Sequence, residues 1–379
     1  MKKILLVVLS FTLGLAPGGR AQEVQAGAVN AKILAGAQKL LETLSDSERR
    51  KAVFDFKDAA QRKRWSNLPS GIFQRAGLRM GDLSQPQRDA VLTVLAAALS
   101  PQGYEKVLQI IEGDEVLKKI EGGGRGGPGG PGGRGPGGPG GPPPGGPGGP
   151  NGSGGPGGRG GPGGGLIFGK DEYFISFLGQ PSVTEPWMIQ FGGHHLAINI
   201  TMVGDQGTLA PSLPAAQPAI YELEGKTVRP LGRENDKAFA LVNALDEAQR
   251  QQTILGAQMR DLVLGPGRDG QTIQPEGIKG SALTEKQRDM LLDLASEWTG
   301  IQNEVAAKAK MDEMKRNIAE TWFAWSGSTE KGRAAYFRIQ GPTVHIEYAP
   351  QRMGGDPTKH IHTIYRDPTN DYGAKWWKR

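Results

Sequence analysis

The feature that most constrains this chain of 379 residues is a tract rich in glycine and proline that interrupts it. Residues 122–165 contain 28 glycines, 11 prolines and three arginines, and no large apolar side chain. Because such a segment cannot build a hydrophobic core, we expect a low-complexity, disordered insert with extended, polyproline-like character. Its glycines do not keep the strict three-residue period that a collagen triple helix requires. The insert separates residues 22–121 from residues 166–379.

The first 21 residues read as a signal peptide. Lys2 and Lys3 precede an apolar stretch at residues 4–16, and small residues lead to a cleavage site near Ala21. The stretch is shorter than the about 20 apolar residues that span a bilayer comfortably, which leaves a retained anchor as the alternative. We expect an exported protein, periplasmic or extracellular, with no transmembrane segment in the mature chain.

Charge and cysteine content exclude several classes of protein. The formal net charge is +6, but three of these charges lie in the signal peptide and three in the glycine-rich insert. The remaining chain is close to neutral, so a nucleic-acid partner loses its electrostatic support. The chain has no cysteine, which excludes disulfides, a thiolate nucleophile and thiolate metal ligands.

The two parts differ in their hydrophobic period. Before the insert, apolar residues recur at helical spacing over 29–44, and capping boxes begin at Ser45 and Ser84. After it, alternation predicts strands over 172–178, 187–191 and 195–203, and then capped helices that begin at Asp246 and Thr284. A long charged helix around 301–325 and closing strands over 334–340, 343–349 and 360–366 follow. We predict an α+β fold, with the helical N-terminal part packed on a mainly antiparallel sheet that carries additional helices.

Three helix starts are similar in sequence: SQPQR at 84–88, DEAQR at 246–250 and TEKQR at 284–288. Capping chemistry alone favours these residue types at the beginning of a helix. We therefore interpret the similarity as shared capping and not as an internal repeat.

All five histidines follow the insert, and strand alternation groups four metal-competent side chains. His345 should face the same side as Glu347, and His360 the same side as His362. A hairpin through residues 351–359 would bring all four onto one sheet face. Imidazole and carboxylate suit Zn, Cu or Fe, and three protein ligands with an open position are typical of a catalytic metal. The alternative is that these imidazoles make ordinary hydrogen bonds on a polar or buried sheet face.

His194 and His195 are adjacent, and neighbouring residues of a strand face opposite sides. At most one of them should join a site on a given face, unless Gly192 and Gly193 introduce a bulge. We favour His195 as the inward ring and place His194 behind it.

The motifs GHHL at 193–196, WSGS at 325–328, YFRIQGP at 336–342 and HIHTIYRDPTNDYG at 360–373 resemble the family of exported proteins called domain of unknown function 3500. Residues 64–88 also resemble the helical N-terminal portion of that family. The resemblance implies one domain on both sides of the insert and no established activity. His345 lies outside the family pattern. The positions that the resemblance singles out are His194, His195, Glu347, His360, His362, Arg366 and Asp367.

Together these patterns predict a metal-dependent enzyme, either a hydrolase or an oxidoreductase, that acts on a small molecule or peptide. His360, His362 and Glu347 would bind the metal directly, and one of the two GHHL histidines would complete the site. Arg366 would orient an anionic substrate group, and Asp367 would hold a histidine tautomer. The alternative is a non-catalytic binding module of the cell envelope whose polar cluster is structural.

Overall fold

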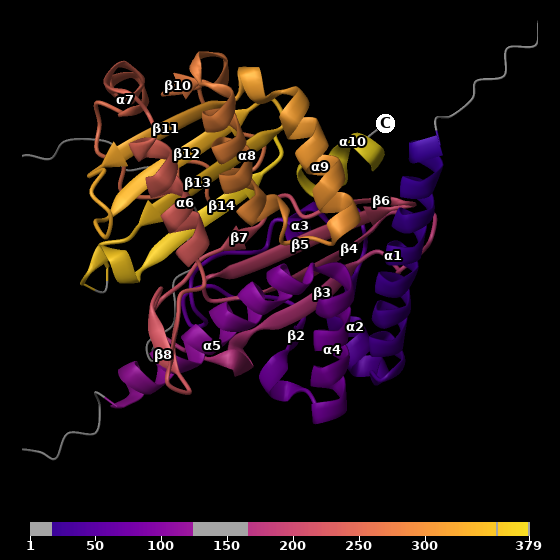
Figure 1. Ribbon diagram of the computed structural model, residues 1–379. Helices are drawn as coiled ribbons and strands as arrows, with labels where there is room; N and C mark the ends of the chain where they lie inside the picture. Colours follow the sequence, from indigo (N-terminus) through magenta and orange to yellow (C-terminus); the bar gives the residue numbers. More distant parts are fainter. Residues whose placement is uncertain (1–16, 124–165, 354, 378–379) are drawn as a thin grey trace, which may run out of the picture.

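The computed structural model describes residues 17–123, 166–353 and 355–377 (Figure 1). Of the predicted signal peptide at 1–21, residues 1–16 lie outside these ranges. Of the predicted insert at 122–165, residues 124–165 lie outside them. Helix α1 begins at Pro17. No helix within the described ranges is long and apolar enough to cross a membrane.

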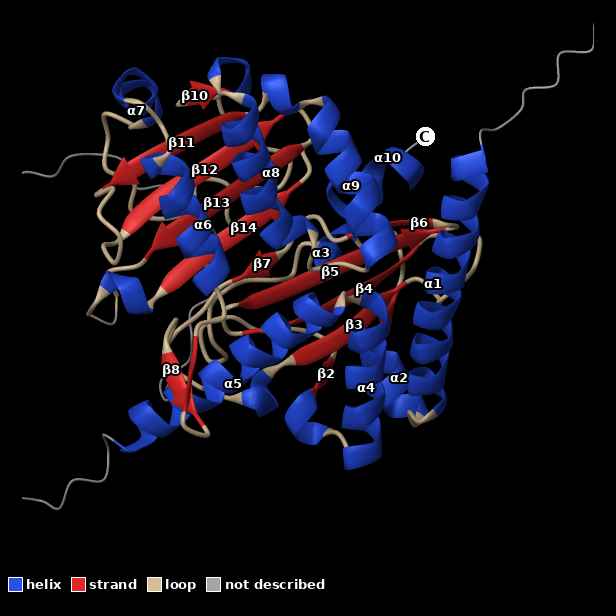
Figure 2. Ribbon diagram, in the orientation of Figure 1, coloured by secondary structure: helices blue, strands red, loops and turns tan. Residues whose placement is uncertain are grey.

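Two mainly antiparallel sheets and their covering helices confirm the predicted α+β fold (Figure 2). The first sheet has the order β1-β3-β4-β5-β6, with β2 beside β3 and β7 beside β5. Its strands are β1 (Val53–Phe54), β2 (Leu78–Arg79), β3 (Phe174–Leu178), β4 (Trp187–Gly193), β5 (Leu196–Val203), β6 (Gln206–Thr208) and β7 (Leu213–Pro214). The second sheet has the order β10 (Ile278–Lys279), β11 (Trp322–Gly327), β12 (Ala335–Gly341), β13 (Val344–Pro350) and β14 (Ile361–Arg366). A separate hairpin pairs β8 (Tyr221–Leu223) with β9 (Lys226–Val228).

Each sheet is covered by its own helices. The helices are α1 (Pro17–Glu42), α2 (Asp46–Ala52), α3 (Ala59–Arg62), α4 (Gln85–Ala98), α5 (Pro101–Gly123), α6 (Gly232–Asn243), α7 (Glu247–Thr253), α8 (Glu285–Thr299), α9 (Glu304–Arg316) and α10 (Ala374–Trp377). Buried residues of α1, α4 and α5 form one core with the first sheet, and those of α6 and α8 form another with the second. Figure 1 shows α6 and α8 in front of the second sheet.

The capping boxes place the helix starts where the sequence predicts them. Ser45, Ser84, Asp246 and Thr284 each cap a helix, and each exchanges hydrogen bonds with the residue three positions later. The predicted helix over 301–325 is wrong in its second half. Helix α9 ends at Arg316, and WFAWSG instead forms β11, because aromatic side chains favour a pleated sheet whose faces bury them.

The two sheets are joined edge to edge. Ser212, beside β7, exchanges backbone hydrogen bonds of 2.9 and 2.8 Å with Tyr365 in β14. Ala216 exchanges a second pair with Ile361 at 2.9 and 3.0 Å. The end of β14 that begins at Ile361 therefore lies beside the segment that follows β7.

The two halves also share one architecture, which contradicts our interpretation of the similar helix starts. Residues 77–89 and 277–289 each fold into a short strand, a 3-10 turn and a capped helix, β2-η1 (Met80–Asp82)-α4 and β10-η3 (Gly280–Ala282)-α8. Cross-strand partners correspond at a constant sequence offset: Phe177–Ile189–Ile200 in the first sheet and Trp325–Phe337–Tyr348 in the second. The similarity therefore extends beyond capping to strand register, and the fold contains an internal repeat.

Candidate metal centre

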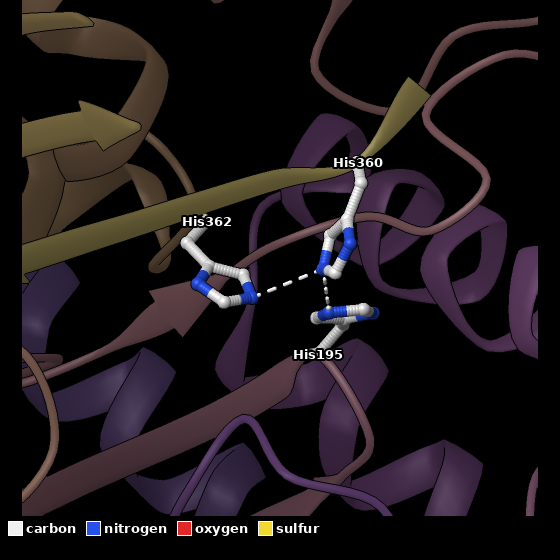
Figure 3. Close-up of side chains that lie close together, drawn as sticks. All are labelled: His195, His360 and His362. Carbon is white, nitrogen blue, oxygen red and sulfur yellow. Dashed lines mark hydrogen bonds between the residues drawn. The ribbon is translucent and has the colours of Figure 1, made fainter. Parts of the chain in front are cut away.

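Three histidines from distant parts of the sequence meet where the two halves adjoin. His195 Nε2 lies 2.9 Å from His360 Nε2, which lies 3.1 Å from His362 Nε2. All three ligand atoms lie within 4.8 Å of one another. Figure 3 shows His360 and His362 pointing from β14 toward His195. Nitrogen ligands at about 2.0–2.1 Å from a tetrahedral zinc ion are about 3.3 Å apart, so this spacing fits one ion after small adjustments.

Strand β14 positions two of the rings. His360 directly precedes the strand, and His362 lies within it. Because side chains two residues apart leave the same face of a strand, both imidazoles point to one side. The HxH spacing thus produces the local geometry that the sequence pattern predicts.

The third ring comes from a tight turn and not, as we predicted, from a strand. His194 and His195 connect β4 to β5, whose terminal residues Gly193 and Leu196 are paired. His195 has a φ of 59°, in the left-handed region that residues other than glycine rarely adopt. Its backbone N–H donates to the Asn67 carbonyl at 3.1 Å, and its own carbonyl accepts from Ala215 at 2.8 Å. These bonds hold the turn, and with it the ring, against the second sheet.

His194 lies behind His195 and outside the ligand group. The two rings do not diverge as they would on a strand, because their centroids are only 3.7 Å apart. His194 Nδ1 lies 2.7 Å from Asp114 Oδ1 in α5, and the Phe168 ring packs against its imidazole at 4.9 Å. The structure thus brings His195 to the other two histidines and His194 to Asp114.

The hydrogen bonds of β14 determine where two protons reside. His360 Nδ1 lies 2.7 Å from the Met353 carbonyl oxygen, which can only accept, so this nitrogen carries the hydrogen. His362 Nδ1 lies 3.1 Å from Asp261 Oδ1 and carries a hydrogen for the same reason. In the neutral rings each Nε2 then carries a lone pair, and the two lone pairs face each other. Asn67 Nδ2 lies 3.1 Å from His362 Nε2 and can donate a hydrogen bond to it in this tautomer.

Burial favours the neutral form of His195 and His360. His195, His360 and His362 are 3%, 7% and 8% exposed. Burial, and then repulsion from His194 and the other two rings, holds the pKa of His195 well below its ordinary value. Burial lowers the pKa of His360 to about 4, although its hydrogen bond to the Met353 carbonyl opposes the shift. Neutral imidazole is the form that binds metal ions.

Glu347 shares the sheet face of His362 but lies farther along it. Glu347 pairs with Ile364, whereas His362 pairs with Ala349. The Glu347 carboxylate accepts four hydrogen bonds of 2.7–2.8 Å, from Val263 N, Leu264 N, the Tyr336 hydroxyl and His345 Nε2. Burial alone would raise the pKa of Glu347, but His345 and these backbone N–H groups outweigh burial and hold it below its ordinary value. Its oxygens are therefore committed, and His345 is committed with them.

Arg366 and Asp367 are likewise engaged away from the three histidines. Arg366 Nη1 lies 2.8 Å from Asp371 and 3.2 Å from Asp269, and its other nitrogens donate to the Leu264 and Gly265 carbonyls. Asp367 Oδ2 lies 2.6 Å from Lys310 Nζ. The structure does not bring either side chain to the histidine group, so their predicted roles at the metal do not follow from this geometry.

Comparison with known proteins identifies the family. The family model described as "Protein of unknown function (DUF3500)" matches residues 26–374. The chain belongs to the DUF3500 family. No curated protein and no solved structure matches it.

Sequence reasoning missed two polar partners of the site in this DUF3500 protein. Asp261 holds His362, and Gln351 Nε2 in turn donates to Asp261 Oδ1 at 2.9 Å. Asn67 reaches His362 from the loop between α3 and β2. Both lie in irregular segments where no period predicts a facing direction. The family motif around WSNLP was the only indication available for Asn67.

The donor set of the DUF3500 protein is chemically coherent. His195, His360 and His362 form a buried group that could hold a metal ion. Two of the three rings have a partner on the nitrogen that faces away from the group, which is the usual outer arrangement of metal-binding histidines. Three neutral nitrogen ligands would leave one tetrahedral position for water or a substrate atom.

Proposed function

We propose that His195, His360 and His362 bind a divalent transition metal, zinc, copper or iron, and that the protein is a metal-dependent enzyme. The observation that carries the proposal is the pair of facing lone pairs on His360 and His362, 3.1 Å apart. Both lone pairs point to the same space as His195 Nε2, which lies 2.9 Å from His360 Nε2, so one cation there could be bound by all three nitrogens. Zinc or iron bound by imidazoles with a free position would supply Lewis-acid or redox chemistry for a hydrolase or an oxidoreductase.

The surface around the site supports an active site that receives a small molecule or peptide. Eleven large hydrophobic side chains are exposed among the described residues. Five of them, Leu68, Ile72, Leu166, Ile167 and Met353, belong to the segments that contact the site. Leu68, Ile72, Leu166 and Ile167 lie on the two segments that the Ser70–Ile167 bridge joins. The backbone carbonyl of Met353 accepts the hydrogen bond from His360 Nδ1. Exposed apolar side chains on segments next to a polar site are what a binding surface for a small molecule or peptide would present.

A structural metal in a non-catalytic binding module is the second candidate. His195 belongs to the hairpin of the first sheet, whereas His360 directly precedes the edge strand of the second sheet and His362 lies within it. An ion at this position would cross-link the two halves. The near-complete burial of the three rings favours this role, and turnover by the metal-loaded protein would separate the two candidates.

We also propose that the protein is exported and cleaved near Ala21. The basic start, the apolar stretch and the small residues before the cleavage site support this proposal. Expression of the full chain in a bacterial host, followed by N-terminal sequencing of periplasmic and secreted fractions, tests it. A mature chain that begins at Gln22 is the expected result, and an uncleaved chain confined to the cytoplasm would contradict it.

Metal analysis of the purified protein tests the site. We expect one transition-metal ion per chain after dialysis or reconstitution, and loss of that ion in His360→Ala and His362→Ala. His345→Gln is the matched control, since it removes a buried histidine outside the group. Absence of stoichiometric metal in the parent, or equal loss in the control, would end the proposal.

Activity is tested on the metal-loaded protein with ester, amide and phosphoester substrates and with dioxygen consumption. Turnover that is lost in His362→Ala and retained in His345→Gln is the expected result. Stoichiometric metal without turnover on any of these would favour the structural role.

A further inference from the structure

A cavity lies on the opposite side of β14 from the histidines. Its volume is about 470 Å³, within the range of about 300–1,000 Å³ that is usual for small-molecule sites. It is bounded by α9, the β5–β6 turn, Asn30 of α1 and the segment after β14, so both halves of the repeat contribute to its wall. Tyr365 lines it, and strand alternation sends this side chain to the face opposite His362.

The floor of this cavity is made of polar side chains that are nearly inaccessible. The exposed fractions are 1% for Tyr365, 4% for Gln302, 5% for Asn370 and 9% for Asn303. Asp367, which the family motif singled out and the metal centre does not use, is also there and is 4% exposed. Buried polar groups in native proteins normally have hydrogen-bond partners.

Several of these groups have no partner among the described residues. The Tyr365 hydroxyl and the Gln302 side-chain amide make no hydrogen bond there, and neither does Nδ2 of Asn303 or Asn370. Burial, together with the Asp367, Asp371 and Glu313 carboxylates, raises the pKa of Tyr365 well above its ordinary value, so its hydroxyl stays a donor. None of these atoms is among the described side-chain atoms that are both inaccessible and unpartnered, so they are open to the cavity. The cavity therefore offers hydrogen-bonding groups for an occupant to satisfy.

The charges of the cavity balance. Lys310 Nζ lies 2.6 Å from Asp367 Oδ2 and 2.8 Å from Glu313 Oε2. Lys310 with its two carboxylates thus carries one net negative charge, and Asp205 adds another. The exposed cations Arg316 and Lys375, which also line the cavity, offset these two charges. A site without net charge does not select for an anion or a cation, and its amides, hydroxyl and carboxylates provide both donors and acceptors.

We propose that this cavity binds a neutral polyhydroxylated molecule, a sugar of one or two rings. Each hydroxyl of a sugar can donate and accept at once, which matches donors such as Tyr365 and Asn370 beside acceptors such as Glu313 and the Gln302 side-chain carbonyl. The site is separate from the metal centre, so its occupancy does not depend on the function proposed above. Ordered water is the competing occupant.

Saturation-transfer NMR and calorimetry on the full chain test this assignment. The probes are glucose, galactose, N-acetylglucosamine, cellobiose and maltose, with inorganic phosphate and acetate as anionic comparisons. We expect saturable binding of at least one sugar. The Tyr365→Phe variant should weaken it about three- to tenfold, since one hydrogen bond is lost. Gln302→Met should weaken it to a similar extent.

Both variants remove only groups that have no partner, so the fold should tolerate them, and urea unfolding checks this. Tyr104→Phe is the control, because the Tyr104 hydroxyl makes no hydrogen bond among the described residues and lies outside the cavity. Failure of every sugar to bind overturns the proposal and leaves water as the occupant. Binding that is unchanged in Tyr365→Phe and Gln302→Met overturns the location. Saturable binding of phosphate or acetate alone overturns the ligand class.

Discussion

His360 Nε2 and His362 Nε2 face each other across 3.1 Å, and both rings carry their N–H on the other nitrogen. The Met353 carbonyl and the Asp261 carboxylate enforce this arrangement, because neither can donate a hydrogen bond to a ring. Strand spacing brings the rings together, but these two partners turn their lone pairs inward. The affinity of the site should therefore depend on groups that never touch the ion.

Asp261→Ala should weaken metal binding about 10- to 100-fold, because the carboxylate that orients His362 is lost. Competition with a chelator of known affinity measures this change. Asp293→Ala is a matched control: Asp293 is 62% exposed against 59% for Asp261, and it pairs with Lys237 on α6. Equal affinities in the two variants would show that Asp261 does not orient the ligand.

The metal-free protein should lose stability in acid through His360. Its pKa is about 4 in the folded state and 6.5 as a free side chain, so the unfolded chain takes up the proton first. The contribution is present above pH 6.5 and is lost as the pH falls toward 4, and its full size is about 3 kcal/mol. His195 acts in the same direction, because its pKa is also lowered.

Urea unfolding with a chelator at pH 7, 6, 5 and 4 checks this dependence. The parent should lose about 3 kcal/mol more than His360→Gln over this interval, because the variant has no proton to take up. Parallel pH profiles for the two proteins would exclude His360 as the source.

The sequence was informative about which residues share a face and uninformative about register. Period-two spacing correctly placed Glu347 and His362 on one face of the second sheet. The residues between β13 and β14 determine which residues of the two strands lie opposite each other. They place Ala349 opposite His362 and Glu347 opposite Ile364, two residues farther along the sheet. Because loop conformation determines register, alternation alone could not exclude Glu347 as a ligand.

The histidine pair shows a different limit. The two histidines directly precede the alternating apolar residues of β5, and histidine is not a usual turn former, so the sequence predicts a strand there. The turn forms because Gly193 and Leu196 close the hairpin at the position where Gly341 and Val344 close its counterpart in the repeat. Recognising the repeat would have placed the turn, since residues 342 and 343 between the latter strands correspond to His194 and His195.

The repeat itself was visible in the sequence and was misread. Gln87 Nε2 donates to the Thr43 carbonyl, and Gln287 Nε2 donates to the Ala244 carbonyl. Each glutamine also caps its own helix by accepting from the backbone N–H of Ser84 or Thr284. Capping explains that bond, whereas the bond to the carbonyl at the end of α1 or α6 requires the same packing in both halves.

Glu347→Gln should destabilise the fold without affecting metal binding. The buried carboxylate accepts two backbone N–H groups, and hydrogen bonds to a charged group contribute about 1.5–3 kcal/mol. An amide can accept only part of this set, so we expect a loss of about 2–4 kcal/mol in urea unfolding. The metal affinity, measured on the folded variant, should equal that of the parent. A selective loss of metal at unchanged stability would return Glu347 to the site.

His195→Gly and His195→Ala should separate the backbone of the turn from its ring. Both variants remove the imidazole, so both should lose the metal and the rise in unfolding temperature that metal gives the parent. They differ in the cost of the left-handed backbone, which glycine adopts freely and alanine does not. The metal-free glycine variant should therefore be about 1 kcal/mol more stable than the alanine variant in urea unfolding. Equal stabilities would mean that the turn relaxes when the ring is removed, and that the imidazole contacts with His194 and His360 impose the positive φ.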